Sequence, residues 1–235
     1  TVNHFCGSSM QAIHMAAGAI SMGAGDAYIC AGIESMTRVP MMGFNPLLNP
    51  ALAKEYPPAY VSMGETAENV AEKFQVTRED QDKFALRSQE KALKAQVENK
   101  FKEEIVNFKI KSQKTELNFN KDEHPREGIN LETLSRLKPV FKKDGTVTAG
   151  NASGINDGAA AVVLMTAEAA EAKGLKPLAR IVSWAQSGVD PAIMGKLVQR
   201  VERICVTLNN HRTLFANRNV PTKHTELREK CMPLA

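Results

Sequence analysis

The sequence predicts an α/β fold, because patterns typical of helices and of buried strands alternate in its N-terminal part and return after residue 158. Apolar residues recur at intervals of three and four from Met10 to Ile20, which predicts one face of a helix. The extended stretch 1–5 precedes this helix, and the continuously apolar stretch 27–32, typical of a buried parallel strand, follows it. Together these segments predict a strand–helix–strand unit.

Residues after this unit have a different character. Several prolines divide their first part into loops, and two amphipathic helices follow, at about 64–74 and from Thr77 to about 97. Thr77 is a suitable N-cap for the second helix, since its hydroxyl can accept a hydrogen bond from an N–H of the first turn. Lys and Glu dominate residues 98–127, which predicts a solvated and largely irregular segment.

The core pattern returns near the end of the chain. It predicts a buried strand at 159–165, a short helix at 168–173 that Gly174 ends, and a half-buried strand at 179–185. Since these elements resemble those of the N-terminal unit, we interpret the residues between as an insertion in one α/β core.

These patterns divide the chain into four parts: a core in two segments, 1–37 and 146–195, a loop-domain insertion at 38–145, and a divergent tail at 196–235. The chain has 235 residues, 43% of them hydrophobic, which is enough to bury one sizeable core. The net charge of +4 is concentrated in the tail. Because the body has no basic stripe with interleaved aromatic residues, we expect no nucleic acid partner.

The remaining composition limits the class of protein. No apolar run approaches the roughly 18 residues of a membrane span. The four cysteines are scattered, and no histidine lies at metal-ligand spacing from them, so we expect no metal site. Few, scattered cysteines suit a reducing compartment, and no secretory signal is present, so we expect a cytoplasmic protein. The absence of an initiator Met suggests that the sequence begins within a domain.

Cys6 is the first candidate catalytic residue. It lies between the predicted strand and the N-terminus of the predicted helix, where backbone N–H groups and the helix dipole favour a nucleophilic thiolate. The small residues Gly7, Ser8 and Ser9 leave room for a substrate carbonyl and for N–H donors to an oxyanion. The alternative, which spacing alone leaves open, is a buried cysteine that acts as a small hydrophobic residue.

Residues 148–161 form the second candidate site. Three glycines and small polar residues precede the predicted strand 159–165, so a ligand could approach the backbone closely. The stretch lacks the Lys-Ser/Thr ending of a phosphate-binding loop, and no helix follows it. The alternative is a tight connection into a core strand.

Several motifs, in order from Thr1 to about Gly195, resemble those of the thiolase family. The first is the nucleophile segment, which contains Asn-His-Phe-Cys-Gly-Ser-Ser-Met, and the last contains Gly-Asn-Ala-Ser-Gly. Between them lie the strand that follows the nucleophile and the start of the loop-domain helices. The similar segments are 3–12, 25–36, 62–71, 77–89 and 146–161.

The resemblance implies the layered fold of thiolases. This chain would form the N-terminal half of a five-layered αβαβα architecture, an αβα arrangement with an inserted, mostly helical loop domain. Family members are dimers or tetramers, so the resemblance implies a homodimer or homotetramer. Coenzyme A would be a substrate, and no cofactor is implied. In a eukaryote the protein would be mitochondrial or peroxisomal.

The resemblance also implies an acetyl-CoA C-acyltransferase. Cys6 would attack the 3-keto carbon of a 3-ketoacyl-CoA, acetyl-CoA would leave, and a second CoA would remove the shortened acyl chain from Cys6. Ser153, with Ala149 nearby, and Met63 would line the pantetheine tunnel. Arg126 would face the phosphates of CoA, for which a guanidinium is well suited. From its position alone, Arg126 could equally be a solvated loop charge.

Two features favour the degradative branch, the 3-ketoacyl-CoA thiolases of fatty-acid β-oxidation. One is the Cys-Gly-Ser-Ser-Met form of the nucleophile segment. The other is Ser62, which stands where many acetoacetyl-CoA thiolases carry His. A biosynthetic acetoacetyl-CoA thiolase is the alternative.

The sequence departs from the family after Gly195. Three motifs that supply the acid–base residues of a complete thiolase, Asn-Glu-Ala-Phe, Gly-His-Pro and Cys-x-Gly-Gly, do not occur, and neither Cys205 nor Cys231 fits the last one. A frameshift near residue 196 would explain the tail. The alternative function is a non-catalytic CoA-binding or oligomerisation remnant. The long insertion and the Gly-Asn-Ala-Ser-Gly segment argue against a third reading, a decarboxylating condensing enzyme.

Overall fold

The structure is a computed structural model that describes residues 1–111, 116–182 and 184–196. The chain divides into two compact units. The first contains Thr1–Glu34 and Gly158–Ser187, and the second contains Ser35–Asp157 and residues 188–196. The domain limits expected from the sequence stay a prediction, and the predicted tail from 197 onward lies outside the described residues.

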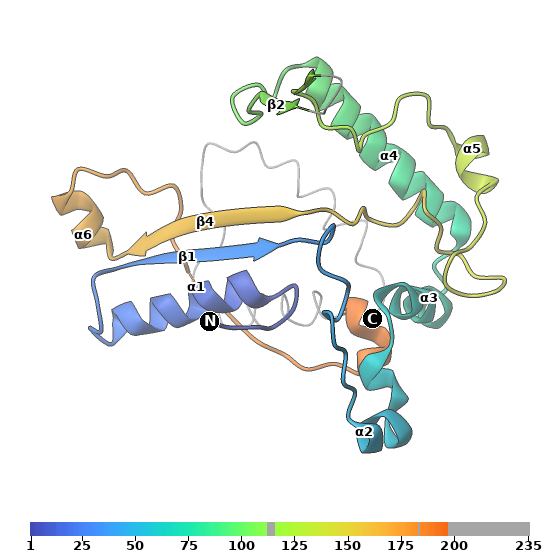
Figure 1. Ribbon diagram of the computed structural model, residues 1–235, viewed down its shortest axis with the longest axis horizontal. Coiled ribbons are helices and arrows are strands. Elements are labelled where there is room, and N and C mark those ends of the chain that lie inside the picture. The colour runs from blue at the N-terminus through green and yellow to red at the C-terminus, as the bar shows by residue number, and fades with distance from the viewer. Residues whose placement is uncertain (112–115, 183, 197–235) are drawn as a thin grey trace. The chain divides into compact units, whose positions relative to one another are not determined.

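The first unit combines a two-stranded sheet with a helix on one face (Figure 1). Strand β1, Ala27–Glu34, pairs antiparallel with β4, Gly158–Met165. Helix α1, Ser8–Ser21, packs against both strands. Cys30 of β1 is buried, and its thiol donates to the Ala12 carbonyl of α1 at 3.7 Å. This face of the sheet is therefore part of the core of the first unit.

The other face of the same sheet is apolar and exposed. Ile29 and Ile33 of β1 are 77% and 84% exposed, and Val163, opposite Ile29 on β4, is 62% exposed. Side chains alternate between the faces of a strand, so these residues point away from Cys30. The prediction of buried parallel strands is therefore wrong. A continuous apolar run does not reveal whether a strand is parallel or antiparallel to its neighbour. The described residues of this unit cover only one face of the sheet.

Two other predicted strands are absent from the residues that the structure describes. Residues 1–5 contain one end of an isolated bridge, and residues 179–182 and 184–185 have no strand structure. A strand needs a hydrogen-bonded neighbour for its backbone, and the described sheet of this unit contains only β1 and β4. The predicted helix after β4 is confirmed as α6, Ala167–Ala172, and Gly174, with φ 65°, follows its end.

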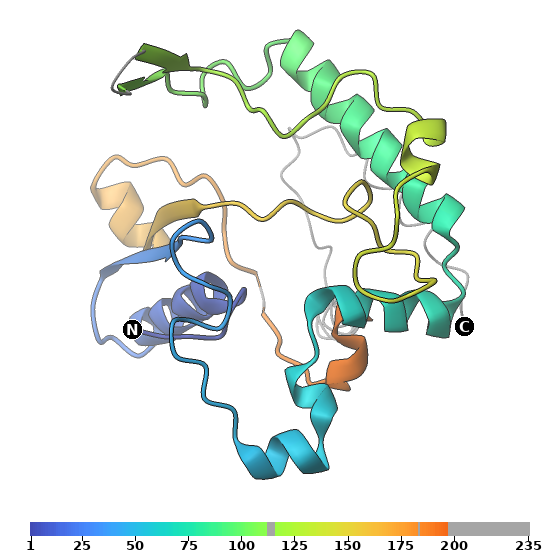
Figure 2. The same cartoon turned by 45° about the vertical axis from the view of Figure 1, so that its right-hand side comes forward.

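The second unit is mostly helical. Its two longest helices, α3 (Met63–Phe74) and α4 (Arg78–Val97), are the two amphipathic helices that the sequence predicts. Helix α5, Leu131–Ser135, packs against α4 (Figure 2). Among the described residues, no helix is long and apolar enough to cross a lipid bilayer. The helices are α2 (Pro50–Glu55), η1 (Pro57–Tyr60), α3 (Met63–Phe74), α4 (Arg78–Val97), α5 (Leu131–Ser135) and η2 (Pro191–Lys196).

Side-chain caps explain where α3 and α4 begin. Ser62 and Glu65 form a reciprocal capping box at the start of α3, so Ser62 has a structural role at this position. Thr77 caps α4 as predicted, since its Oγ1 accepts a hydrogen bond from the Asp80 N–H at 3.1 Å. The same hydroxyl donates to the Asp80 carboxylate at 2.7 Å.

We expect Thr77→Ala to lower the free energy of unfolding of the second unit by about 1 kcal/mol, because one N–H of the first turn of α4 loses its acceptor. Thr77→Ser retains the hydroxyl, so its free energy of unfolding should be close to that of the unchanged protein. Urea unfolding followed by far-UV circular dichroism measures both. Equal midpoints for the Ala and Ser variants would show that the cap does not stabilise α4.

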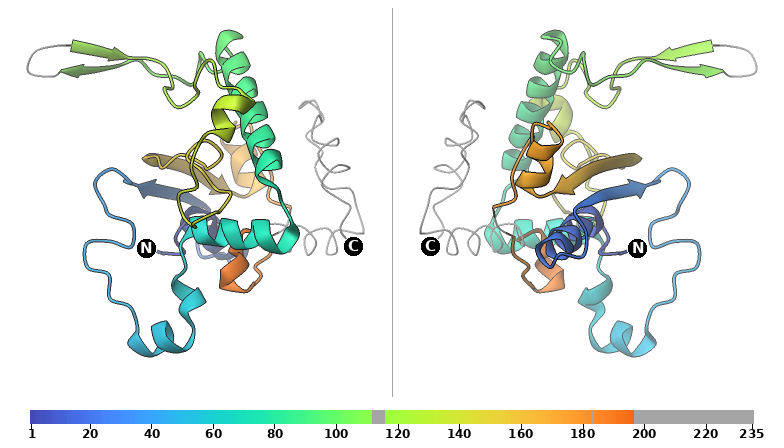
Figure 3. Two further views of the ribbon diagram at one scale, coloured as in Figure 1. Left: turned by 90° about the vertical axis from the view of Figure 1, so that its right-hand side faces the viewer. Right: turned by 90° about the vertical axis from the view of Figure 1, so that its left-hand side faces the viewer.

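A small hairpin lies within the segment predicted to be irregular, which corrects that prediction in part. Strand β2, Phe108–Lys111, pairs antiparallel with β3, Glu116–Phe119, and the hairpin projects away from α4 (Figure 3). Phe108 lies opposite Phe119, and such cross-strand pairs stabilise hairpins. The short alternation of apolar and polar residues in these strands was not recognised in the sequence, because Lys and Glu dominate the residues around it.

Candidate functional site

Cys6 lies in a tight turn immediately before α1. The His4 carbonyl accepts a hydrogen bond from the Gly7 N–H, and the Phe5 carbonyl accepts one from the Ser8 N–H, both at 3.0 Å. The Ser8 hydroxyl closes the turn, because it accepts from the His4 N–H at 2.9 Å and donates to the Phe5 carbonyl at 2.6 Å. Phe5 has φ 49°, a left-handed conformation that is unfavourable for a bulky side chain.

This turn presents the thiol of Cys6 to solvent. Cys6 is exposed, whereas Cys30 is buried, so the alternative of a buried, hydrophobic cysteine fits Cys30 and not Cys6. Gly7 is the N-cap of α1 and provides no side-chain cap for the N–H groups of its first turn. Backbone strain such as that of Phe5 persists where surrounding bonds hold it, and it clusters at functional sites.

In the second unit, a carboxylate of α3 holds the start of the glycine-containing segment 146–154. Glu68 is only 4% exposed. Its two oxygens accept hydrogen bonds from the Thr146 N–H at 2.9 Å, the Thr146 hydroxyl at 2.9 Å and the Val147 N–H at 2.7 Å. The segment that carries Ala149 and Ser153 is therefore tied to the middle of α3.

These contacts keep Glu68 ionised. Burial by itself raises the pKa of Glu68, but the N–H groups of Val147 and Thr146, the Thr146 hydroxyl and the positive charge of Lys142 outweigh it and hold the pKa below the ordinary 4.5. For a lowered pKa, the stabilising contribution is present above the ordinary value and is lost as the pH falls through the lowered one. The contacts thus persist across the neutral range.

Asn151 shapes the middle of the same segment. Its Oδ1 accepts a hydrogen bond from the Thr148 N–H at 2.7 Å, and its Nδ2 donates to the Thr146 carbonyl at 3.0 Å. The Thr148 hydroxyl, fully buried, accepts from the Gly150 N–H at 3.2 Å. Asn151 Nδ2 also donates to the carboxylate of Asp82 on α4 at 3.0 Å.

Asp82 connects this segment to α5. It is 3% exposed and forms an ion pair with Arg78 at 2.8 Å. The Arg78 guanidinium donates to the carbonyls of Leu134 and Leu137 at 2.7 and 3.0 Å. These two carbonyls at the C-terminal end of α5 therefore have a hydrogen-bond donor. A β-carbon at Gly150 would lie 2.7 Å from Leu134 Cδ2, so the segment and α5 are in close contact.

Four of the predicted site residues belong to this second unit. Ala149, Ser153 and Arg126 are exposed, and Met63, the first residue of α3, is 49% exposed. The Arg126 N–H donates to Gln89 Oε1 of α4 at 3.0 Å. Among the described residues, no ion pair involves the Arg126 side chain.

One contact brings the Arg126 and Ser153 segments together. A β-carbon at Gly154 would lie 2.9 Å from Nε2 of His124, so the imidazole packs directly on this glycine. Gly154 follows Ser153, and Arg126 is two residues after His124. The described contacts of this unit do not join Met63 to these residues. Cys6 belongs to the first unit.

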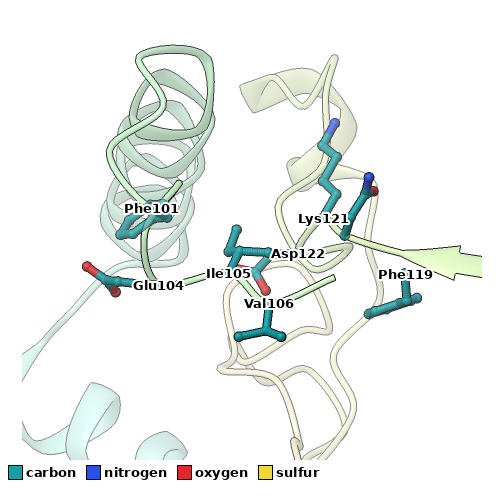
Figure 4. A pocket seen from close by; sticks show the side chains of 8 residues that line it. Phe101, Glu104, Ile105, Val106, Phe119, Lys121 and Asp122 are labelled. Carbon is teal, nitrogen blue, oxygen red and sulfur yellow. The ribbon is translucent and has the colours of Figure 1, made fainter. Parts of the chain in front are cut away.

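A cavity of about 330 Å³ also lies in the second unit, near the base of the hairpin (Figure 4). None of the predicted site residues lines it, so we do not assign it to the candidate site. Within the described ranges, no group of three or more His, Cys, Asp and Glu side chains could hold a metal ion. The residues that line the cavity are Phe101, Glu104, Ile105, Val106, Phe119, Asn120, Lys121 and Asp122.

Two residues that hold the segment 146–154, Glu68 and Asp82, were not predicted from the sequence, whereas Asn151 lies within the predicted segment 148–161. One signal was available for Glu68. It lies three residues before Ala71, so both fall on the buried face of an amphipathic helix. A carboxylate at such a position must find hydrogen-bond donors inside the protein. For Asp82, the i,i+4 spacing to Arg78 was visible, but its burial was not.

Comparisons with known proteins show which family this chain is similar to. The family model for the N-terminal domain of thiolases matches residues 1–168. The chain is 48% identical over 204 residues to a 3-ketoacyl-CoA thiolase of Bacillus subtilis and 45% identical over 205 residues to an acetyl-CoA acetyltransferase of Rhizobium meliloti. Each match covers 83% of this chain and 52% of the relative, so the chain spans about half the length of these curated relatives.

Solved structures give the same result. The dimeric peroxisomal thiolase of Saccharomyces cerevisiae is similar with a TM-score of 0.78 and 35% identity, over 88% of this chain and 53% of that one. The acetyl-CoA acetyltransferase from Syntrophomonas wolfei is similar with a TM-score of 0.73 and 40% identity, over 86% of this chain and 54% of that one.

Proposed function

Because the chain belongs to the thiolase family, we propose that it takes part in acyl transfer of the thiolase type, with Cys6 as the residue that carries the acyl group. The reaction cleaves a 3-ketoacyl-CoA with CoA to acetyl-CoA and a shortened acyl-CoA, or runs in reverse. The observation that supports this proposal most directly is the exposed Cys6 in a tight turn ahead of α1.

In the proposed reaction the Cys6 thiolate adds to the 3-keto carbon of the substrate. The bond between C2 and C3 breaks, and its electron pair stays on C2 of acetyl-CoA, which then takes up a proton from an acid. The thiolate of a second CoA adds to the Cys6 thioester, and Cys6 leaves as thiolate. The resemblance assigns the acid and the base to the second half of a complete thiolase. We therefore assign to this chain the nucleophile, Cys6, and the covalent carriage of the acyl group as its thioester.

The CoA substrate would be bound by residues of the second unit. Ser153 and Ala149 are exposed on a segment whose shape is fixed by hydrogen bonds, and Met63 offers a half-exposed apolar side chain. Arg126 lies close to the Ser153 segment and carries an unpaired charge in the described part of the chain, which suits a phosphate.

We further propose the degradative direction, in fatty-acid β-oxidation, and a homo-oligomeric assembly. The support is the family membership together with the Cys-Gly-Ser-Ser-Met form of the nucleophile segment. One relative is the acetyl-CoA acetyltransferase, cytosolic, of Rattus norvegicus, 47% identical over 203 residues, and a cytoplasmic location of this chain is part of the proposal.

The Arg126→Gln variant tests the CoA site. We expect the acetyl-CoA concentration that gives half-maximal acetylation of Cys6 to rise about tenfold, since a charge-assisted contact to phosphate contributes roughly 1.4 kcal/mol or more. S-Acetylpantetheine lacks the nucleotide phosphates and should show no change. Arg136→Gln, which removes an exposed arginine that pairs with Glu132, is the matched control. Equal losses for both thioesters would contradict the assignment of Arg126 to the phosphates.

A further inference from the structure

The contacts of Glu68 are arranged to fix a backbone rather than to bind a substrate. A carboxylate offers about four acceptor positions on two oxygens. Here the Thr146 N–H contacts both oxygens, the Val147 N–H contacts Oε1 and the Thr146 hydroxyl contacts Oε2, so all four positions are occupied. Gly145 belongs to the same arrangement. A β-carbon there would collide with the Glu68 carboxylate and would lie 2.9 Å from the Lys142 carbonyl, so glycine allows the close approach.

The backbone that follows is satisfied in the same way, inside the protein. The Thr148 and Gly150 N–H groups bind side-chain oxygens of Asn151 and Thr148. The Val147 carbonyl accepts a hydrogen bond from the Val140 N–H at 3.0 Å. Val147 and Thr148 are buried, Thr146 before them is half-buried and Ala149 after them is exposed, so the segment is anchored up to Thr148 and accessible from Ala149.

We propose that Glu68 is a positioning residue, which holds residues 146–151 in the shape that receives the pantetheine arm of CoA. The inference rests on the proposed function, because it takes Ala149 and Ser153 as part of the CoA site. A loop that is already ordered loses less conformational entropy when a ligand binds. Without Glu68, CoA binding would have to order this segment, and affinity would fall while the chemistry at Cys6 stayed the same.

The ionised carboxylate is essential to this role because every group that faces it is a donor. In Glu68→Gln, one oxygen is replaced by an NH₂ group of similar size. In one orientation of the amide, that NH₂ would face the Val147 N–H, which would lose its acceptor. In the other orientation both N–H groups keep an acceptor, but the Thr146 hydroxyl, which already accepts from Gln81 Nε2, would lose its own. The shape of the side chain is retained, so the substitution removes the acceptor and little else.

The experiment compares Glu68→Gln with the unchanged chain in three measurements. We expect faster hydrogen–deuterium exchange in peptides that cover 146–151, at least tenfold weaker CoA binding by isothermal titration calorimetry, and a maximal rate of Cys6 acetylation within twofold of the original. A general loss of structure would instead change all three. Glu72→Gln, an exposed carboxylate on the same helix that pairs with Lys142, is the matched control and should change none.

A milder pair of variants covers the case in which Glu68→Gln does not fold. Thr146→Val removes the hydroxyl that donates to Glu68, and Thr146→Ser retains it. We expect the Thr146→Val variant to bind CoA about threefold to tenfold more weakly, and the Thr146→Ser variant to bind CoA with near-normal affinity. Two results would overturn the inference although the wild-type chain binds CoA: unchanged hydrogen exchange in residues 146–151, or faster exchange there with unchanged CoA affinity. In both cases the proposed CoA site would still stand. If the wild-type chain itself did not bind CoA, the proposed function and this inference would fall together.

Discussion

Replacing Asp82 with alanine should destabilise the second unit by about 3 kcal/mol, the largest stability change that we expect from a single substitution in this chain. The carboxylate is 3% exposed and accepts hydrogen bonds from Arg78 and Asn151. Its removal leaves the part-buried guanidinium of Arg78 without its counter-ion and leaves a donor of Asn151 unpaired. Because Arg78 retains the two carbonyls of Leu134 and Leu137, we place the cost at the lower end for a broken buried pair.

Native-state hydrogen exchange is the suitable measurement for Asp82→Ala, since it reports the opening of α4 and of the segment 146–151 separately from the first unit. Protection in both should decrease together. Lys83→Ala, which breaks an exposed ion pair with Glu79 one residue along the same helix, is the control and should have no measurable effect. Equal protection in the two variants would mean that Asp82 does not connect α4 to the segment.

The two longest helices of the second unit, α3 and α4, could be predicted because their signals are local, whereas α2 and η1 lie in the part that was predicted to be loops. Apolar spacing and the caps at Ser62 and Thr77 lie within a few residues of the helices that they specify. The resemblance likewise predicted the thiolase-like α/β fold, which the likeness to solved thiolases confirms.

The strands were predicted less well because a strand depends on distant partners. The β1 segment is correctly placed in the sequence, but its antiparallel neighbour β4 lies more than a hundred residues away and nothing local specifies the direction. The stretch 179–185 has strand-like alternation, yet its described residues have no strand structure. Alternation indicates a tendency to form a strand, but a strand forms only where its backbone pairs with a neighbouring strand.

The same distinction applies to the candidate site. Cys6 and the Gly-Asn-Ala-Ser-Gly segment are recognisable as motifs, because each is continuous in sequence. Glu68 and Asp82 are not, because their partners Thr146 and Asn151 lie 78 and 69 residues away. A carboxylate on a helix is ordinarily a solvated charge, and only the fold shows that these two are buried and bonded.

The substitution with the largest effect on function should be Cys6→Ala. It removes the sulfur that carries the acyl group, so we expect complete loss of covalent acetylation with little change in stability, because Cys6 is exposed. Cys30→Ala is the control, since Cys30 is buried against α1 and should not be acylated. Persistent acetylation in Cys6→Ala would assign the nucleophile to another residue.

Intact-mass spectrometry after incubation with acetyl-CoA tests the central claim, that Cys6 is an acyl-carrying nucleophile. The account predicts one acetyl group on the wild-type chain and on Cys30→Ala, none on Cys6→Ala, and removal of the group when free CoA is added. A well-folded wild-type chain that binds CoA but acquires no acetyl group would contradict it, and would favour a CoA-binding protein without acyl transfer.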